Sequence, residues 1–339
     1  MYTVTFDPGE LMSLGSQRKR FSIGFFLKGA VLSLGLASLL SGCTRDQDTI
    51  VVDFQKTIAT KKPTQELPHS PSLRVAVGAM ISPKETFIYY RQLIEYIGMK
   101  MGMPIDLVQR KTYGEINQLL GRGEIDLAFI CSGPYAGGKE QHGFEVLAAP
   151  QVQGSHFYRS YLIVNRNQPY QQLEDLRGRV FAFTDPESNT GRLAPTYWLK
   201  QIGEDPERFF AKVIYTYSHD NSILAVGRGL VDGAAVDGLV WEYFGKTNPE
   251  LTRPTRIIKQ SEPYAIPPVV ASGSSPEEQR KQVSQILVSM HLDSEGRRIL
   301  DALMIDRFVV PPADWFESVK QIQMMAASLK EGDHGSKEP

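Results

Sequence analysis

One repeated unit in the middle of the 339-residue chain restricts its fold more than any other feature. Residues 116–130 (INQLLGRGEIDLAFI) and 222–236 (SILAVGRGLVDGAAV) share a helical pattern, a Gly-Arg-Gly turn and a strand that begins with aspartate, at an offset of 106 (222 minus 116). Glycine favours the left-handed backbone that ends many helices, and a short apolar run after it is typical of a buried strand. Two copies of this helix and strand predict two lobes of the same architecture.

Strands and helices alternate around the first copy. Residues 73–78, 105–109 and 125–130 are apolar or β-branched runs, which are typical of buried strands. A helix is expected after Ser82-Pro83-Lys84-Glu85, because this run combines an N-cap, a proline at the first helical position and a capping-box glutamate. A second capped helix is expected from Thr112-x-x-Glu115. This order predicts a parallel α/β lobe.

The second copy is expected in a lobe of its own, with the chain crossing near residue 165 and returning near residue 268. The predicted division is residues 72–165 plus 269–330 for lobe I, with the C-terminal helices packed on it, 166–268 for lobe II, and 331–339 for a tail. Ligands of open α/β sheets bind beyond the carboxyl ends of the strands. We therefore expect a ligand cleft between the lobes that closes by a hinge at the two crossings.

The N-terminal segment has the composition of an export signal. A basic run at residues 18–20 precedes an apolar stretch at 29–42, which fits the apolar region of a signal peptide. A membrane span would need about 20 such residues. Residues 1–11 add nothing to such a signal, so translation could begin at Met1 or at Met12.

The apolar stretch ends in Leu40-Ser41-Gly42-Cys43, which resembles a bacterial lipobox. The resemblance implies cleavage before Cys43 and a lipid on its thiol, so that acyl chains hold the protein at a membrane surface. Residues 1–42 are then a lipoprotein signal peptide, and residues 43–71 are the lipid anchor and a polar tether. An uncleaved signal anchor is the alternative.

Charge and composition exclude several classes of function. Loss of residues 1–42 would remove four basic and two acidic side chains and move the net charge from −1 to −3, so no nucleic-acid surface is expected. No intramolecular disulfide is expected, because Cys131 is the only cysteine besides Cys43. The six histidines are scattered, and no Walker or dinucleotide loop is present, so neither a metal nor a cofactor is predicted. Any anion site must therefore be local.

The turn at residues 184–191 (TDPESNTG) is the first candidate for such a site. It follows a predicted strand and precedes a predicted helix, so its amides lie at the positive end of a helix dipole, where anions bind. Ser188, Asn189 and Thr190 add two hydroxyls and one amide. N-capping by Ser188 or Asn189 is the alternative, but three consecutive donors exceed what a cap needs.

The repeat adds candidates from both lobes. His219 begins the second repeat helix and could donate to an anion, and the offset of 106 makes Tyr113 its counterpart in lobe I. The same offset pairs Cys131 with Asp237 at the ends of the repeat strands. Tyr158 precedes the crossing strand and could donate through its phenol. A structural histidine and ordinary aromatic packing are the alternatives.

Ser188, His219 and Asp220 also contain the residue types of a nucleophile triad. Ser188 does not lie in a Gly-x-Ser-x-Gly elbow, and the adjacent His219 and Asp220 are poorly placed to bond to each other. An envelope hydrolase is therefore the remote alternative, and we expect no catalytic residues and no enzyme activity.

Three motifs together resemble a known family, the phosphate/phosphite/phosphonate-type substrate-binding proteins of ABC transporters, which have the type II periplasmic binding protein fold. They are Asp185-Pro186-x-Ser188-x-Thr190-Gly191, Ser218-His219-Asp220 with the repeat that follows it, and Cys131-Ser132-Gly133-Pro134-Tyr135. The resemblance implies that Ser188, Asn189 and Thr190 bind the ligand oxygens and that Tyr113, Tyr158 and His219 complete the pocket. We add Cys131, Ser132 and Asp237 as candidate ligand-binding residues.

One departure from the family narrows the expected ligand. Aminophosphonate receptors hold the ligand amine with acidic residues, one of them near the return crossing, where this chain has only Ile-Pro-Pro-Val at 266–269. Asp237 could substitute, but it ends a different strand. The sequence therefore predicts a smaller tetrahedral oxyanion, such as phosphate, phosphite or methylphosphonate, recognised mainly by hydrogen-bond donors.

Cys131 is the second departure and opens an alternative. A thiol beside an oxyanion pocket suits a thiophilic ligand, and the chain is also similar to the arsenite-sensing branch of the family, whose members signal to a membrane histidine kinase. A buried cysteine that only packs is the simpler interpretation. The predicted function is a monomeric, lipid-anchored binding protein on the periplasmic or extracytoplasmic face of the cell envelope that delivers its oxyanion to an ABC permease.

Overall fold

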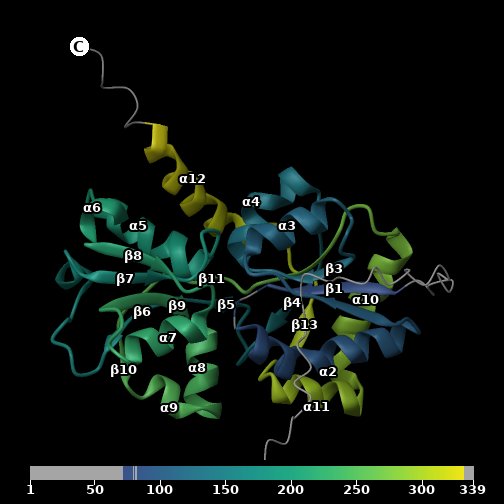
Figure 1. The fold of residues 1–339 in the computed structure, drawn as a ribbon. Coiled ribbons are helices and arrows are strands. Elements are labelled where there is room, and N and C mark those ends of the chain that lie inside the picture. Colours follow the sequence, from purple (N-terminus) through teal and green to yellow (C-terminus); the bar gives the residue numbers. More distant parts are fainter. Residues whose placement is uncertain (1–71, 79, 81, 332–339) are drawn as a thin grey trace, which may run out of the picture. The chain divides into compact units, whose positions relative to one another are not determined.

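The computed structural model describes residues 72–78, 80 and 82–331 (Figure 1). The predictions of a signal peptide at 1–42, a lipid on Cys43 and a tether through residue 71 lie outside the described residues. So does the tail predicted at 331–339, except for residue 331, which ends the last helix. None of the helices within the described ranges is both long enough and apolar enough to span a membrane.

Lobe I is built on a six-stranded sheet with the order β13-β4-β12-β3-β1-β2. β1 pairs in parallel with both β2 and β3, whereas β12 pairs antiparallel with β3 and β4, and β13 antiparallel with β4. The strands are β1 (Leu73–Val77), β2 (Ile105–Val108), β3 (Leu127–Phe129), β4 (Glu145–Gln151), β12 (Val269–Ala271) and β13 (Arg307–Val309). The parallel half of this sheet confirms the prediction for the first repeat.

Helices cover both faces of the lobe I sheet, with α3 and α4 on one side and α2, α10 and α11 on the other (Figure 1). Their bounds are α2 (Pro83–Met101), α3 (Tyr113–Gly121), α4 (Ser132–His142), α10 (Glu277–Ser289), η3 (Met290–Leu292) and α11 (Ser294–Ala302). The predicted capping box of α3 is present, because the Thr112 hydroxyl accepts from the Glu115 amide and the Glu115 carboxylate accepts from the Thr112 amide. Ser82 precedes α2 as predicted, but its hydroxyl makes no capping bond.

Lobe II is built on a five-stranded sheet with the order β10-β6-β9-β7-β8. The central strand β9 pairs in parallel with β7 and antiparallel with β6. The strands are β6 (Ser160–Asn165), β7 (Val180–Phe183), β8 (Lys212–Tyr215), β9 (Gly233–Asp237) and β10 (Thr255–Gln260). The helices are η1 (Leu173–Leu176), η2 (Asn189–Leu193), α5 (Ala194–Gln201), α6 (Pro206–Phe209), α7 (His219–Gly227), α8 (Gly238–Thr247) and α9 (Pro249–Thr252).

The sequence repeat is a structural repeat. α3 and β3 in lobe I match α7 and β9 in lobe II, and the glycines after the helices, Gly123 and Gly229, have φ angles of 69° and 67°. The aspartate of each copy ties its strand to the parallel neighbour: the Asp126 carboxylate accepts from the Arg74 amide at 2.8 Å and the Asp232 carboxylate from the Val180 amide at 2.9 Å.

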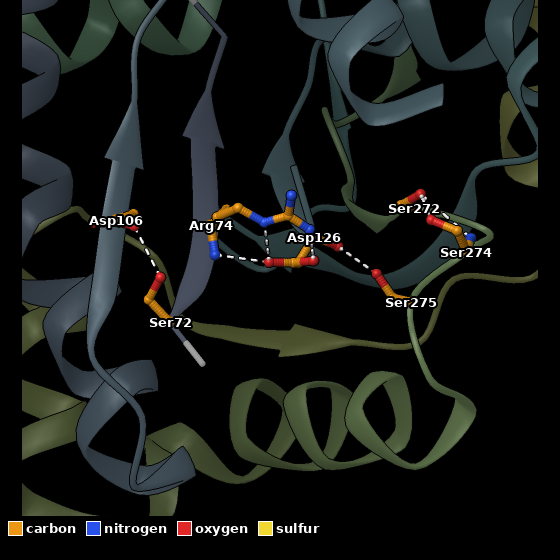
Figure 2. Close-up of polar contacts among 7 residues, drawn as sticks. All are labelled: Ser72, Arg74, Asp106, Asp126, Ser272, Ser274 and Ser275. Atoms are coloured by element: carbon orange, nitrogen blue, oxygen red, sulfur yellow. Dashed lines mark hydrogen bonds and ion pairs between the residues drawn. The ribbon is translucent and has the colours of Figure 1, made fainter. Parts of the chain in front are cut away.

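Figure 2 shows the lobe I version of this link, in which the Arg74 guanidinium also grips the Asp126 carboxylate through two nitrogens. In lobe II, the hydroxyl of Tyr170 takes the place of the guanidinium on Asp232. The aspartates are therefore structural residues at the amino ends of the strands, away from the ends that carry the candidate site.

The predicted lobe boundary between residues 165 and 166 is wrong. β6 (Ser160–Asn165) is an inner strand of the lobe II sheet, so the chain crosses earlier, through β5 (Phe157–Tyr158). β5 pairs antiparallel with β11 (Tyr264–Ala265) on the return, and the two form a separate two-stranded ribbon. The apolar run of β6 fits the interior of either lobe, which is why the sequence alone assigned it to lobe I. On the return, β12 begins at Val269 and belongs to the six-stranded sheet of lobe I.

The prediction that all C-terminal helices pack on lobe I is also wrong in part. α10 and α11 contact α2 as expected, but α12 (Glu317–Glu331), which follows η4 (Ala313–Phe316), contacts α4 of lobe I and α5 of lobe II. Val319 and Ile322 of α12 are buried in the same apolar cluster as Trp198 of α5. The last helix therefore bridges the two lobes.

Candidate functional site

Helix N-termini from both lobes carry the residues that the repeat singled out. Tyr113 is the first residue of α3 and His219 the first residue of α7. Cys131 is the N-cap of α4, and Asp237 is the N-cap of α8. The predicted correspondence between the two pairs is confirmed. Each position follows the carboxyl end of a strand, where the amide groups and the helix dipoles favour negative charge.

The two lobes are in direct contact at these helix ends. The Tyr113 amide of lobe I donates to Asp185 Oδ2 of lobe II at 3.1 Å, and the His219 amide of lobe II donates to the Met80 carbonyl oxygen at 2.9 Å. Two further hydrogen bonds of 2.9 Å cross the same boundary, from the Ser82 amide to Asp220 Oδ1 and from Asn117 Nδ2 to Glu187 Oε2. The conformation is therefore closed over the candidate site.

Glycine at position 133 permits this close approach. A Cβ atom added there would lie 2.4 Å from the Glu187 carbonyl oxygen of the opposite lobe. Because the obstructing atom belongs to the backbone, a side chain at this position would hold the lobes apart. This contact explains a glycine in the Cys131-Ser132-Gly133 motif.

Tyr158, from the crossing ribbon, joins the lobe I and lobe II parts of the site. Its phenol oxygen lies 2.8 Å from Ser132 Oγ and accepts from Asn189 Nδ2 at 3.3 Å. Burial raises the pKa of the Cys131 thiol to about 11, although the nearby amides of Asn189 and Gly133 act in the opposite direction. The thiol is consequently protonated at neutral pH, unlike the thiolate that binds thiophilic ligands.

The turn at 184–191 contains both a cap and unpaired donors. Ser188 is the N-cap of η2, and its hydroxyl oxygen accepts from the Gly191 amide at 3.0 Å, so the capping alternative holds for Ser188. The neighbouring Thr190 hydroxyl is fully buried and has no partner, while its carbonyl oxygen accepts from Ser160 Oγ at 2.7 Å. Position 191 must be glycine, because a Cβ would lie 1.7 Å from Thr184 Oγ1.

A hydrogen bond joins His219 and Asp237 in lobe II. The Asp237 amide donates to His219 Nδ1 at 3.0 Å, so the neutral ring carries its proton on Nε2. Burial lowers the pKa of His219 to about 3. Burial also raises the pKa of the Asp237 carboxyl to about 7, although one of its oxygens accepts from the amides of Leu239 and Val240.

Unpaired buried polar atoms concentrate at this site. Of the ten buried side-chain nitrogen and oxygen atoms without a hydrogen-bond partner in the described part of the chain, seven lie in or beside it. They are Tyr113 Oη, Asn117 Oδ1, Thr184 Oγ1, Asn189 Oδ1, Thr190 Oγ1, Ser218 Oγ and His219 Nε2. An unpaired buried polar atom costs about 1–3 kcal/mol. A cluster of them therefore indicates a place built for a polar ligand.

All nine ligand-binding candidates from the sequence are buried at this one junction. Sequence reasoning missed Met80, which packs against Tyr113 and Cys131, and Asn117, which bonds across the lobes. Met80 follows the carboxyl end of β1, a position that could have marked it. Asn117 lies within α3 between apolar residues, and no pattern distinguishes it.

The fold and this junction define a two-lobed binding protein of the type II periplasmic class, and solved structures support that fold. A binding protein component of an ABC phosphonate transporter from Pseudomonas aeruginosa aligns with a TM-score of 0.74 at 20% identity, covering 79% of this chain and 90% of that one. PhnD1 of Prochlorococcus marinus, solved in complex with methylphosphonate, aligns with a TM-score of 0.68 at 20% identity, covering 75% and 97%. The predicted fold class is confirmed.

The chain belongs to the family of periplasmic substrate-binding proteins of phosphonate ABC transporters, whose sequence profile matches residues 75–316. Among curated relatives, a probable phosphite-binding protein of an ABC transporter from Prochlorococcus marinus is 25% identical over 49% of this chain. A phosphate-import protein of Mycolicibacterium smegmatis is 28% identical over 60% of it. The matched regions span 60% and 63% of those two relatives.

Proposed function

We propose that this protein is the extracytoplasmic binding component of an ABC importer and captures a small tetrahedral oxyanion: phosphate, phosphite or a small phosphonate. The observation that carries the proposal is the set of buried donors without partners, Tyr113 Oη from lobe I and Thr190 Oγ1 and His219 Nε2 from lobe II. The family, and relatives named for phosphite binding, phosphate import and phosphonate binding, support the same ligand class.

Neutral donors would do most of the recognition. The phenol of Tyr113, the hydroxyl of Thr190 and the Nε2–H of His219 each supply one hydrogen bond to an anion oxygen, and hydrogen bonds to a charged acceptor are about twice as strong as neutral ones. The N-termini of η2, α3, α4, α7 and α8 add partial positive charge from both lobes. An oxyanion could therefore be held without an arginine or lysine against it.

The protonation state of the Asp237 carboxyl would affect how tightly the anion binds. Burial raises the pKa of its carboxyl to about 7, so near neutrality a large fraction of it is protonated. In that form it can donate a hydrogen bond to the anion, whereas the ionised form would repel it. We expect anion binding to favour the protonated form and hence to weaken as the pH rises through about 7.

Closure of the lobes would couple binding to delivery. The donors come from opposite lobes, so one anion can satisfy them all only in the closed form, in which the amides of Tyr113 and His219 also bond across the boundary. Binding thus shifts the population toward the closed form, which is the form a permease would recognise. The β5–β11 ribbon is the segment about which such a movement would turn.

The lipid anchor on Cys43 and a monomeric state belong to this proposal. A lipid and a polar tether would keep the receptor beside the permease without a membrane-spanning helix. Intact mass of the purified full chain should show cleavage before Cys43 with acyl chains on it, and light scattering in detergent should show one chain per particle. An unmodified Cys43 would refute the anchor and leave the ligand proposal intact.

The geometry favours the importer over the two alternatives. A hydrolase would need His219 as a base on Ser188, but Ser188 Oγ caps η2, and His219 Nδ1 accepts from the Asp237 backbone instead of donating to a carboxylate. An arsenite sensor would need a reactive thiolate, but burial raises the pKa of Cys131 to about 11.

The test is a thermal-shift and calorimetric panel of phosphate, phosphite, methylphosphonate, arsenate and arsenite with the purified full chain. A ligand at 100 times its Kd stabilises the folded state by about 2.7 kcal/mol. We expect at least one of the tetrahedral anions to do so and arsenite to have no effect. If none of the tetrahedral anions binds, the proposed function is wrong.

A further inference from the structure

A separate cavity of about 150 Å³ lies between α8 of lobe II and the body of lobe I. Sixteen of the twenty residues that line it are apolar or aromatic, and the remaining four are Gln153, Asp237, Glu242 and Lys246. Most of its lobe I wall is the surface of the lobe I core, including Phe129, Val269, Ile305 and Phe308. Its opposite wall is formed by α8, including Leu239, Val240 and Tyr243.

The cavity adjoins the buried donors Tyr113, Thr190 and His219, which are called the donor cluster below. Met80 and Asp237 are common to both: each lines the cavity, and each contacts the donor side. The Met80 side chain packs on Tyr113 and Cys131, and the Asp237 amide bonds to His219. An anion held by Tyr113 and His219 would therefore have this cavity as the adjoining space for a substituent.

Two of the three charged residues in the wall, Asp237 and Glu242, already have hydrogen-bond partners. One Asp237 oxygen accepts from the first amides of α8, and Glu242 forms a short hydrogen bond with the Tyr161 hydroxyl. Apart from Gln153 and Lys246, the rest of the wall is an apolar surface from both lobes. A cavity with such walls favours an apolar group over an ammonium group, because the ammonium would lose its hydration without a dedicated partner.

Backbone strain also marks this cavity. In the described part of the chain, three non-glycine residues have a positive φ, and two of them, Gln153 at 51° and Met304 at 55°, line the cavity. Conformations of this kind cost free energy and cluster at ligand-binding positions. The two strained residues lie on different segments, one before β5 and the other before β13.

We propose that this cavity receives the apolar substituent of an alkyl- or arylphosphonate whose phosphonate group is held by the donor cluster. The inference rests on the proposed function and extends its ligand class beyond methylphosphonate. A protein cavity of about 150 Å³ can hold a benzene-sized group. Substituents from ethyl to phenyl fit that limit.

The sharpest comparison is between n-propylphosphonate and 2-aminoethylphosphonate, which have the same number of heavy atoms and differ only at the end of the chain. Burial of one methylene contributes about 0.8 kcal/mol, which is a factor of about four in Kd. We expect n-propylphosphonate to bind the full chain about 15-fold more tightly than methylphosphonate. We expect 2-aminoethylphosphonate to bind no more tightly than methylphosphonate.

A cavity-filling variant tests the location. In Val240→Phe the larger side chain would occupy the cavity, and the propyl-to-methyl affinity ratio should fall from about 15 to about 1, since the gain of about four-fold per methylene is lost. The matched control is Leu230→Phe, at a residue that is 68% exposed and outside the cavity, which should keep the ratio of the wild type. Melting temperatures of both variants would show whether each is folded.

Calorimetric titration of the wild type and both variants with these phosphonates distinguishes the possible outcomes. Tighter binding of n-propyl than methyl, lost in Val240→Phe alone, supports the inference. Weaker binding of n-propyl than methyl overturns it, and tighter binding of 2-aminoethyl than n-propyl overturns it in favour of an amine subsite at Asp237. If phosphate, phosphite, methylphosphonate and arsenate also fail to bind, the proposed function itself is refuted together with this inference.

Discussion

The two copies of the repeat place the same backbone elements at the site, but the side chains at matching positions are of different chemical types. Lobe I contributes the phenol of Tyr113 and the thiol of Cys131. Burial raises the pKa of the phenol well above its usual value and the pKa of the thiol to about 11. Lobe II offers an imidazole and a carboxyl, His219 and Asp237, with pKa values of about 3 and about 7. Lobe I is therefore expected to contribute binding that is insensitive to pH, whereas lobe II should set any pH response near neutrality.

The largest effect is expected from His219→Ala in lobe II. This change removes the Nε2 donor and leaves the Asp237 amide buried without its acceptor. We expect oxyanion affinity to fall about 100-fold and the free energy of unfolding to fall by about 1–3 kcal/mol. Calorimetry and denaturant unfolding measure the two effects.

His291→Ala is the matched control, because His291 lies in η3 of lobe I, away from the junction. It should leave the affinity unchanged. Equal losses in the two variants would mean that His219 has no direct role in binding.

A smaller effect is expected from the lobe I counterpart, Tyr113→Phe. The phenol oxygen is buried without a partner, so its removal should cost about ten-fold in oxyanion affinity yet raise the stability of the ligand-free protein by up to about 1 kcal/mol. Thermal unfolding with and without ligand separates the two.

Tyr170→Phe is the control, and we expect it to change stability and oxyanion affinity in the opposite pattern to Tyr113→Phe. Its hydroxyl bonds to Asp232 at the amino end of β9, so this change should lower stability and leave affinity intact. If Tyr113→Phe behaved in the same way, the Tyr113 hydroxyl would be structural.

Next in size is the pH response of Asp237→Asn. The raised pKa of Asp237 makes the folded state bind a proton more tightly than the unfolded state between about pH 4 and pH 7. Its contribution to stability is therefore present at low pH and lost as the pH rises through about 7. The lowered pKa of His219 acts in the opposite direction, since its contribution is lost as the pH falls from about 6.5 toward 3.

Between pH 4 and pH 7 the two contributions oppose each other in the wild type. Relative to the wild type, Asp237→Asn should be more stable toward pH 7 and should lose stability more steeply on acidification. Denaturant unfolding at several pH values measures this, with Asp301→Asn at an exposed carboxylate as the control. Parallel curves for wild type and Asp237→Asn would contradict the raised pKa.

The smallest effect is expected from Cys131→Ser. Serine is a good N-cap, and its hydroxyl could accept a hydrogen bond from the nearby amides of Asn189 and Gly133. Oxyanion affinity should change less than two-fold by calorimetry. A loss of ten-fold or more would show that the thiol itself contacts the ligand and would revive the sensor alternative.

The sequence predicted which residues meet at the candidate site better than it predicted the path of the chain between the lobes. The offset of 106 placed Tyr113 opposite His219 and Cys131 opposite Asp237, because a helix, a glycine turn and an aspartate-led strand constrain the backbone locally. These signals act over a few residues, and both copies carry them.

The errors concern choices that local pattern does not determine. β6 is equally suited to the interior of either sheet, and only its pairing with β9 and β10 assigns it to lobe II. The apolar face of α12 likewise contacts both lobes. The hydrogen bond between His219 and the Asp237 amide depends on the distance between α7 and the end of β9, which spacing in the sequence does not predict.

The central claim is that donors from both lobes converge on one oxyanion, and calorimetric titration of the full chain with phosphate, phosphite and methylphosphonate tests it most directly. We expect saturable binding of one ligand per chain for at least one of the three anions, weakened both by Tyr113→Phe from lobe I and by His219→Ala from lobe II. Saturable binding that neither change weakens, or no binding of any of the three anions, would contradict the claim.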